Sequence, residues 1–118
     1  MSAIGESSEI EVDPEWVAER LAEDPTAQVV DVREAYEREA GHIAGSQHIE
    51  LAKLSSEAGK LERDRPVIFY CRLGSRSDMA AQALRAAGFT AYSMRGGLTR
   101  WAGEGRPLLP ENGYVADH

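Results

Sequence analysis

The chain contains one cysteine, Cys71, and the residues that follow it are of kinds that make a thiol reactive. A thiol acts as a nucleophile in its thiolate form, which nearby cations and helix N-termini favour. Arg72 and Arg76 place two fixed positive charges close to this cysteine. Gly74 allows a sharp turn in which several main-chain N–H groups converge on an anion. The pattern predicts a loop that can hold a thiolate, a persulfide or a bound oxyanion.

A structural role is the alternative for Cys71. Cysteine is among the residue types most often buried, and this one could simply end a buried strand before an ordinary helix cap. A purely structural role for the cysteine does not explain the two arginines and the glycine that follow it in the sequence, so we favour the reactive interpretation.

The elements around Cys71 would place it where ligands bind in α/β proteins. The apolar run Val67–Tyr70 predicts a buried strand that ends just before the cysteine. A helix is predicted from about residue 75 to residue 87, with Gly88 at the expected C′ position. On this helix the spacing predicts one core-facing stripe, formed by Met79, Ala80, Ala83, Leu84 and Ala87. The carboxyl end of a strand, followed by a helix, is the usual ligand-binding position in open parallel sheets.

The rest of the chain alternates short apolar runs with helical stretches. The expected strands are residues 10–12, 28–32 and 89–94, and the expected helices are residues 14–22, 34–40 and 98–103. Nearly continuous apolar strands are typical of a parallel sheet covered on both faces. The sequence therefore predicts an α/β fold with a central, mostly parallel sheet and helices on both faces.

Length and composition indicate one globular domain. The chain has 118 residues, of which 42% are apolar and 28% charged, and this excludes a disordered or low-complexity chain. We expect a short N-terminal tail at residues 1–8, one domain at residues 9–106 and a C-terminal tail at residues 107–118. A single cysteine allows no internal disulfide and suits a reducing compartment. Since the chain shows no signal-peptide pattern and no apolar run near the length of about 18 residues that a spanning helix needs, we expect a cytoplasmic protein without a membrane partner.

The charges are unevenly distributed along the chain. The net charge of −7 disfavours nucleic acid as a partner. Residues 1–40 carry twelve acids against three bases, a net charge of −9, whereas residues 70–106 carry six arginines against two acids, a net charge of +4. We therefore expect positive charge where a ligand would meet Cys71.

Four segments, in this order along the chain, resemble those of single-domain rhodanese-like sulfurtransferases. They are Asp31–Arg33, like an aspartate-x-arginine after an early strand; Gly41–Ser46, like a glycine-histidine-isoleucine-proline-glycine-alanine segment; Cys71–Ser77, like the active-site loop; and Gly96–Gly97 with Trp101, like a late glycine pair and tryptophan. The resemblance covers residues 9–106. Three residues depart from the family's pattern: Arg38 replaces a common aromatic residue, Ala44 a proline and Ser46 an alanine.

The resemblance implies sulfur transfer without a cofactor. Cys71 would attack the outer sulfur of a small anionic donor such as thiosulfate and carry that sulfur as a persulfide. The loop that would bind the donor and stabilise the persulfide consists of Arg72, Leu73, Gly74, Ser75, Arg76 and Ser77. A second nucleophile, cyanide or a thiol, would then take the sulfur, and the thiol could belong to thioredoxin or to a sulfur-carrier protein. Two half-reactions of this kind give ping-pong kinetics.

Three other residues of the resembling segments have a stronger structural interpretation. Asp31 and Arg33 follow a strand and are expected to form a buried ion pair that shapes the floor of the site. His42 is expected to make a structural hydrogen bond. The three histidines show no metal-ligand spacing with one another or with Cys71, so no metal site is predicted.

Two alternative functions are also consistent with the sequence. Cysteine phosphatases and arsenate reductases are similar, but their loops place five residues between cysteine and arginine, whereas four separate Cys71 from Arg76. A rhodanese-like domain could instead be a non-catalytic interaction module or a redox sensor, since an exposed thiolate is oxidisable.

Overall fold

The strand before Cys71 is the central strand of a parallel sheet. The computed structural model describes residues 9–118. Its strands are β1 (Glu11–Val12), β2 (Gln28–Asp31), β3 (Gln47–His48), β4 (Val67–Tyr70) and β5 (Ala91–Met94). They lie in the order β1-β5-β4-β2-β3, and the four pairings between them are parallel. Because the strands point one way, their carboxyl ends share one edge of the sheet.

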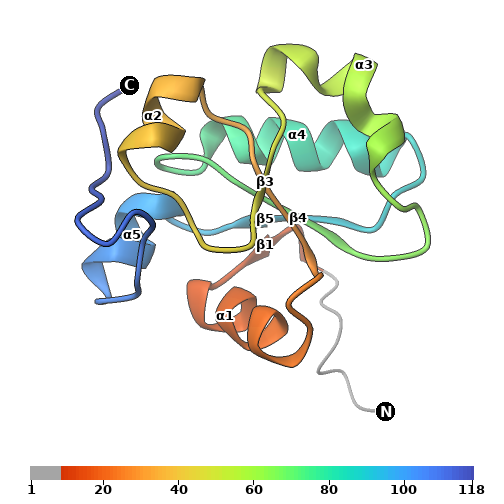
Figure 1. Ribbon diagram of the computed structural model, residues 1–118. Coiled ribbons are helices and arrows are strands. Elements are labelled where there is room, and N and C mark those ends of the chain that lie inside the picture. Colours follow the sequence, from red (N-terminus) through yellow and green to blue (C-terminus); the bar gives the residue numbers. More distant parts are fainter. Residues whose placement is uncertain (1–8) are drawn as a thin grey trace.

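Helices cover both faces of this sheet, as the sequence predicts (Figure 1). The α-helices are α1 (Pro14–Glu23), α2 (Ala35–Ala40), α3 (Leu54–Glu57), α4 (Ser75–Ala86) and α5 (Gly97–Gly103), and 3-10 turns at Leu51–Lys53 and Ala58–Lys60 flank α3. α1 and α5 pack on one face, and α3 and α4 cover the other. Within residues 9–118, no helix has the length and apolar character needed to cross a membrane.

Two apolar cores, one on each face of the sheet, hold these layers together. Every residue of β2, β4 and β5 is buried. Side chains alternate along a strand, so Val30 and Phe69 reach the core under α4, while Val29, Ile68 and Tyr70 reach the core beside α1 and α5. Burial on both faces explains why these strands read as almost continuous apolar runs.

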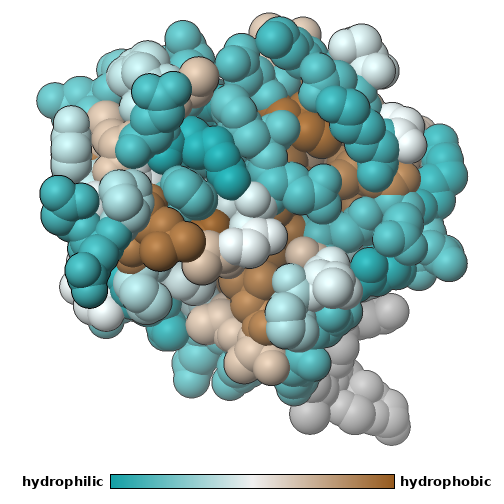
Figure 2. All heavy atoms as spheres, in the orientation of Figure 1, coloured by the Kyte–Doolittle hydropathy of each residue, from teal (hydrophilic) through white to brown (hydrophobic). Residues whose placement is uncertain are grey.

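The predicted stripe on α4 is wrong for three of its five residues. Met79 is 55% exposed, and Ala83 and Ala87 are exposed as well. The residues of α4 that are buried are Ser77, Ala80, Ala81 and Leu84. Met79, Ala83 and Ala87 instead line a groove of about 760 Å³ that also touches α3, where Figure 2 shows apolar surface. Small apolar residues occupy two adjacent faces of this helix, so their spacing alone does not reveal which face meets the sheet.

Candidate active site

Cys71 directly follows β4, and its sulfur lies against the first turn of α4. The residue is 1% exposed. The main-chain N–H groups of Gly74 and Ser77 donate hydrogen bonds to Sγ, at 3.1 and 3.4 Å. Gly74 has a φ of 122°, a conformation that favours glycine. Two N–H groups that converge at the N-terminus of a 12-residue helix make a favourable setting for a sulfur anion.

Buried hydroxyl groups fix this loop to the sheet. The Ser77 hydroxyl donates to the Gly74 carbonyl at 3.1 Å and lies 2.7 Å from the hydroxyl of Ser93 on β5. The sulfur of Cys71 lies 3.6 Å from Ser77 Oγ. Ser77 and Ser93 are fully buried. Ser77 therefore ties the loop both to the sulfur and to the neighbouring strand.

Gly97 lets a second helix close around the loop. The first turn of α5 donates two main-chain hydrogen bonds to it, from Leu98 to the Cys71 carbonyl at 2.8 Å and from Thr99 to the Arg72 carbonyl at 3.1 Å. A Cβ on Gly97 would overlap the Arg72 carbonyl, and the φ of this glycine is 61°. Backbone therefore packs directly on backbone here, which only glycine permits.

Arg76 is held by a carboxylate that no sequence motif marks. Glu37 on α2 accepts hydrogen bonds from both terminal nitrogens of Arg76, at 2.8 and 3.0 Å, and one from the main-chain N–H of Glu34 at 3.0 Å. Burial alone would raise the pKa of Glu37, but the bonds from Arg76 outweigh burial, so this pKa lies below its usual value. The same bonds raise the pKa of Arg76, and negative charge on Cys71 raises it further. Arg76 is therefore a fixed cation of the site.

Arg72 also has a carboxylate partner. Its Nη2 lies 3.2 Å from Oδ1 of Asp117, whose side chain is 97% exposed, so solvent screens this pair. Its Nε is buried without a hydrogen-bond partner among residues 9–118. Arg72 thus keeps one buried donor that no protein group of the described chain uses.

Folding pairs several arginines of the basic segment with acids from other parts of the chain. The two loop arginines pair with Glu37 and Asp117, and Arg95 and Arg100 both pair with Asp13. Acids of the N-terminal third therefore pair with three of these four arginines, and an acid of the C-terminal tail pairs with the fourth. The positive charge expected around Cys71 from chain position is offset, because folding brings the oppositely charged segments together.

Asp31 and Arg33 form a buried pair at the carboxyl end of β2, the strand next to β4. Nε and Nη2 of Arg33 donate to the Asp31 carboxylate at 2.8 and 2.7 Å, and Nη2 also donates to the Gly41 carbonyl at 2.7 Å. Both side chains are fully buried. Burial would lower the pKa of Arg33, but the hydrogen bonds and charge of Asp31 raise it above its usual value. The guanidinium therefore stays charged in the interior.

Two residues that depart from the rhodanese-like pattern contact each other. Arg38 donates to the carbonyl and to the hydroxyl of Ser46, at 2.6 and 3.1 Å, and lies 3.4 Å from the Asp31 carboxylate. The Ser46 hydroxyl lies 3.0 Å from the Tyr70 hydroxyl. Burial raises the pKa of Tyr70 to about 12, so its phenol stays neutral. The two departures therefore form one network with the buried pair.

A cavity of about 100 Å³ opens at the sulfur. It is lined by Cys71, Arg72, Leu73, Ser75, Arg76 and His118. Five of these six belong to the predicted loop, and the other two loop residues, Gly74 and Ser77, contact the sulfur itself. Asp31, Arg33 and His42 do not line the cavity, and the His42 ring lies 3.1 Å from the Arg38 carbonyl. His118 has no local motif around it, so only the fold reveals its place in the site.

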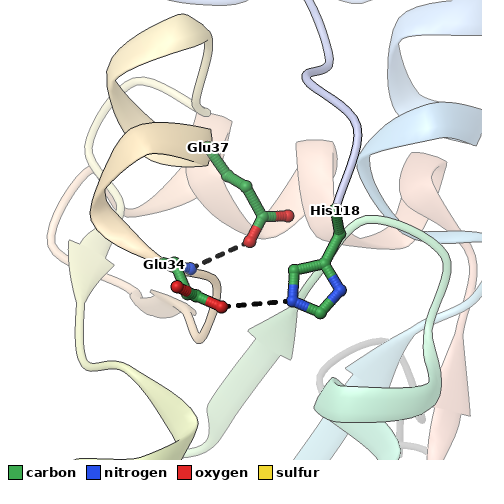
Figure 3. Close-up of side chains that lie close together, drawn as sticks. All are labelled: Glu34, Glu37 and His118. Atoms are coloured by element: carbon green, nitrogen blue, oxygen red, sulfur yellow. Dashed lines mark hydrogen bonds and ion pairs between the residues drawn. The ribbon is translucent and has the colours of Figure 1, made fainter.

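His118 lies beside two glutamates of the α2 segment (Figure 3). Its Nε2 is 3.2 Å from a carboxylate oxygen of Glu34. Ligand atoms of Glu34, Glu37 and His118 lie within 4.8 Å of one another, close enough for all three to bind one metal ion. Both oxygens of Glu37 already accept hydrogen bonds from Arg76, so a metal ion would compete with that guanidinium. Hydrogen bonds within the protein account for this group, and we assign it no metal.

Known proteins share this sequence pattern and fold. The family model for the Rhodanese-like domain matches residues 13–104. The chain is 31% identical over 104 residues to a protein named sulfurtransferase from Allochromatium vinosum, covering 87% of this chain and 97% of that protein. It is 43% identical over 79 residues to the uncharacterized protein YqhL of Bacillus subtilis, which is 66% of this chain but only 63% of the length of that relative. A crystal structure of a rhodanese-related protein from Thermoplasma volcanium has a TM-score of 0.78 and 30% identity, covering 86% of this chain and 98% of that one. The chain therefore belongs to the rhodanese-like domain family.

Proposed function

We propose that the protein is a sulfurtransferase that carries a sulfane sulfur as a persulfide on Cys71. The observation that carries the proposal is the setting of Sγ, which accepts two main-chain hydrogen bonds and lines a cavity of about 100 Å³. Fixed N–H donors stabilise negative charge on the thiolate, and the cavity leaves room for the outer sulfur of a persulfide. The sulfurtransferase from Allochromatium vinosum supports the same class of reaction.

The first half-reaction moves one sulfur atom onto the protein. The Cys71 thiolate attacks the sulfane sulfur of a small anionic donor, for which we propose thiosulfate. The new Sγ–S bond forms as the S–S bond of thiosulfate breaks, and sulfite leaves with the bonding electron pair. Arg72 and Arg76 line the cavity in which that charge develops, and their positive charges would stabilise it.

The second half-reaction returns the protein to its starting state. A nucleophile, cyanide or a thiolate, attacks the outer sulfur of the persulfide, the Sγ–S bond breaks, and Cys71 leaves as a thiolate. No oxidant or reductant is consumed, and one cysteine suffices because the acceptor is external. A thiol acceptor could be a small molecule, thioredoxin or a sulfur-carrier protein. The two separate steps predict ping-pong kinetics.

Intact-mass spectrometry tests this proposal. After incubation with thiosulfate we expect one added sulfur atom, which cyanide removes as thiocyanate. The Cys71→Ser variant should acquire no sulfur. The proposal fails if the wild-type protein takes up no sulfur, or if Cys71→Ser takes it up equally. Rapid, Cys71-dependent hydrolysis of an aryl phosphate would instead identify a phosphatase.

A further inference from the structure

Residues 114–118, which we call the C-terminal strap, run past α2 (Figure 1). The last of them, His118, lines the Cys71 cavity. The main-chain N–H of Tyr114 donates to the Ala40 carbonyl at 2.9 Å. The Tyr36 hydroxyl donates to the carbonyl of Asp117 at 3.1 Å. The strap is therefore attached to α2 at both of its ends.

Bare backbone at Gly41 leaves room for the strap. A Cβ on Gly41 would lie 2.5 Å from the Tyr114 carbonyl oxygen and 2.9 Å from the Tyr114 nitrogen. The φ of Gly41 is 178°, an extended conformation that any residue adopts. The close approach of the strap, and not backbone strain, therefore explains a glycine here.

His118 is the residue of the cavity lining that lies outside the loop that carries Cys71. Its side chain is 43% exposed, and Nε2 faces the Glu34 carboxylate at 3.2 Å. Glu34 is itself fixed, because it is the N-cap of α2 and exchanges hydrogen bonds with Glu37 in a capping box. Figure 3 shows that the other ring nitrogen points away from both glutamates. The ring is thus held in place by a group outside the cavity.

We propose that His118 is a specificity-determining residue that admits sulfur donors with a small leaving group and excludes those with a bulky one. The inference rests on the proposed function. The cavity of about 100 Å³ receives the incoming sulfur and the part of the leaving group next to it. Since an apolar cavity that binds benzene alone has about 150 Å³, an aryl leaving group would extend beyond this cavity and meet the imidazole in its wall. Removal of this side chain would widen the cavity and leave the hydrogen bonds to Sγ unchanged.

Two sulfur donors of equal charge distinguish the effect of leaving-group size from that of leaving-group charge. Methanethiosulfonate and benzenethiosulfonate are both monoanions and differ only in the group on the sulfonyl sulfur. With either donor the Cys71 thiolate attacks the sulfane sulfur, the Sγ–S bond forms, the S–S bond breaks, and a sulfinate leaves with the electron pair. With cyanide as acceptor, the kcat/KM for the donor reports this half-reaction alone under ping-pong kinetics.

The measured quantity is the ratio of kcat/KM for benzenethiosulfonate to that for methanethiosulfonate. In His118→Ala we expect this ratio to rise at least about tenfold over wild type, the size of effect that a pocket wall has on substrate choice. His118→Phe restores bulk without the hydrogen bond and should return the ratio to near the wild-type value. Glu111→Ala removes an exposed side chain from the same tail, outside the cavity lining, and should leave the ratio unchanged.

Three results would overturn the inference. A wild-type ratio in His118→Ala, with persulfide formed on Cys71, would refute the size filter and leave the proposed function standing. Failure of His118→Phe to restore discrimination would show that bulk is not the property that matters. If wild type forms no persulfide from either donor, the proposed function fails and the inference fails with it. Thermal unfolding of each variant establishes that the kinetics are those of folded protein.

Discussion

The carboxylate of Glu37 and the guanidinium of Arg76 meet through two hydrogen bonds, at 2.8 and 3.0 Å, that join α2 to the first turn of α4. The Glu37 side chain is fully buried and that of Arg76 is 15% exposed. A buried bidentate pair of this kind orients the arginine as well as neutralising it. The loop cation of the site is thus positioned from a helix that precedes it in the chain.

Replacing Glu37 by glutamine leaves Arg76 against a neutral partner. We expect the free energy of unfolding to fall by about 2–4 kcal/mol at neutral pH, because a largely buried cation then lacks its counter-charge. Urea denaturation followed by circular dichroism measures this change. Glu39→Gln, exposed on the same helix, is the control and should change the value by less than about 0.5 kcal/mol. Equal effects of the two substitutions would show that the pair does not stabilise the fold.

The same pair makes stability depend on pH. Burial would raise the pKa of Glu37, but the hydrogen bonds from Arg76 outweigh it and lower the pKa, whereas the unfolded chain has an ordinary glutamate pKa of about 4.3. The stabilisation is therefore complete above that ordinary value. It is lost as pH falls from there through the folded-state pKa, because the unfolded chain binds the proton first. The difference in unfolding free energy between wild type and Glu37→Gln should therefore stay constant from about pH 7 to about pH 5 and narrow from there to about pH 3. A difference that stays constant down to about pH 3 would contradict this account.

Asp31→Asn tests whether the buried Asp31–Arg33 pair is architectural. Both side chains are fully buried, so we expect the free energy of unfolding to drop by about 3–5 kcal/mol when Arg33 loses its counter-charge. The fraction that stays folded should still form the Cys71 persulfide, because neither residue lines the cavity. Asp64→Asn, at an exposed position, provides the control. Loss of persulfide formation in fully folded Asp31→Asn would instead assign the pair a part in the chemistry.

Gly41→Ala should displace the C-terminal strap. The new Cβ meets backbone atoms of Tyr114 that cannot rotate away, and we expect a destabilisation of about 1–3 kcal/mol. The benzenethiosulfonate to methanethiosulfonate ratio should rise in the same direction as in His118→Ala. Gly59→Ala is the matched control, because nothing lies within 4 Å of a Cβ there. An unchanged ratio in a destabilised Gly41→Ala would separate the position of the strap from donor choice.

Asp117→Asn should improve the binding of a dianionic donor. The carboxylate lies 3.2 Å from Arg72 and is almost fully exposed, so we expect the KM for thiosulfate to fall by roughly two- to fivefold at low salt. The effect should vanish near 1 M salt, where charges are screened beyond about 3 Å. Steady-state kinetics at the two salt concentrations measure it, with Glu111→Gln as the charge-matched control. A salt-independent change, or the same change in Glu111→Gln, would argue against competition at Arg72.

The sequence predicts the strand, loop and helix around Cys71 well, because those features are local. An apolar run, a cysteine, a glycine and a helical stretch follow one another without interruption, and their geometry depends on neighbouring residues. The same holds for Gly97, whose place in the motif was visible, although its contact with the Arg72 carbonyl was not.

The partners of the two loop arginines could not be predicted, because they lie far away in the chain. Glu37 and Asp117 are ordinary acids in an acidic protein. They contact the loop arginines only because the fold places α2 and the strap beside the loop. His118 belongs to a segment that composition marks only as a tail. The predicted core-facing stripe on α4 was wrong for a different reason. Alanine side chains occur both buried and exposed, so their spacing does not identify the face of the helix that packs on the sheet.

The position of β4 within the sheet has a consequence for how this molecule could be altered. Neighbouring strands are hydrogen-bonded to both of its sides, and structure of that kind opens only when the whole domain does. The strap belongs to no helix or strand, so it can open locally at a smaller cost in free energy. The nucleophile and the wall that faces it thus differ in rigidity, and an engineer could redesign residues 114–118 for new donors while the reactive sulfur keeps its surroundings.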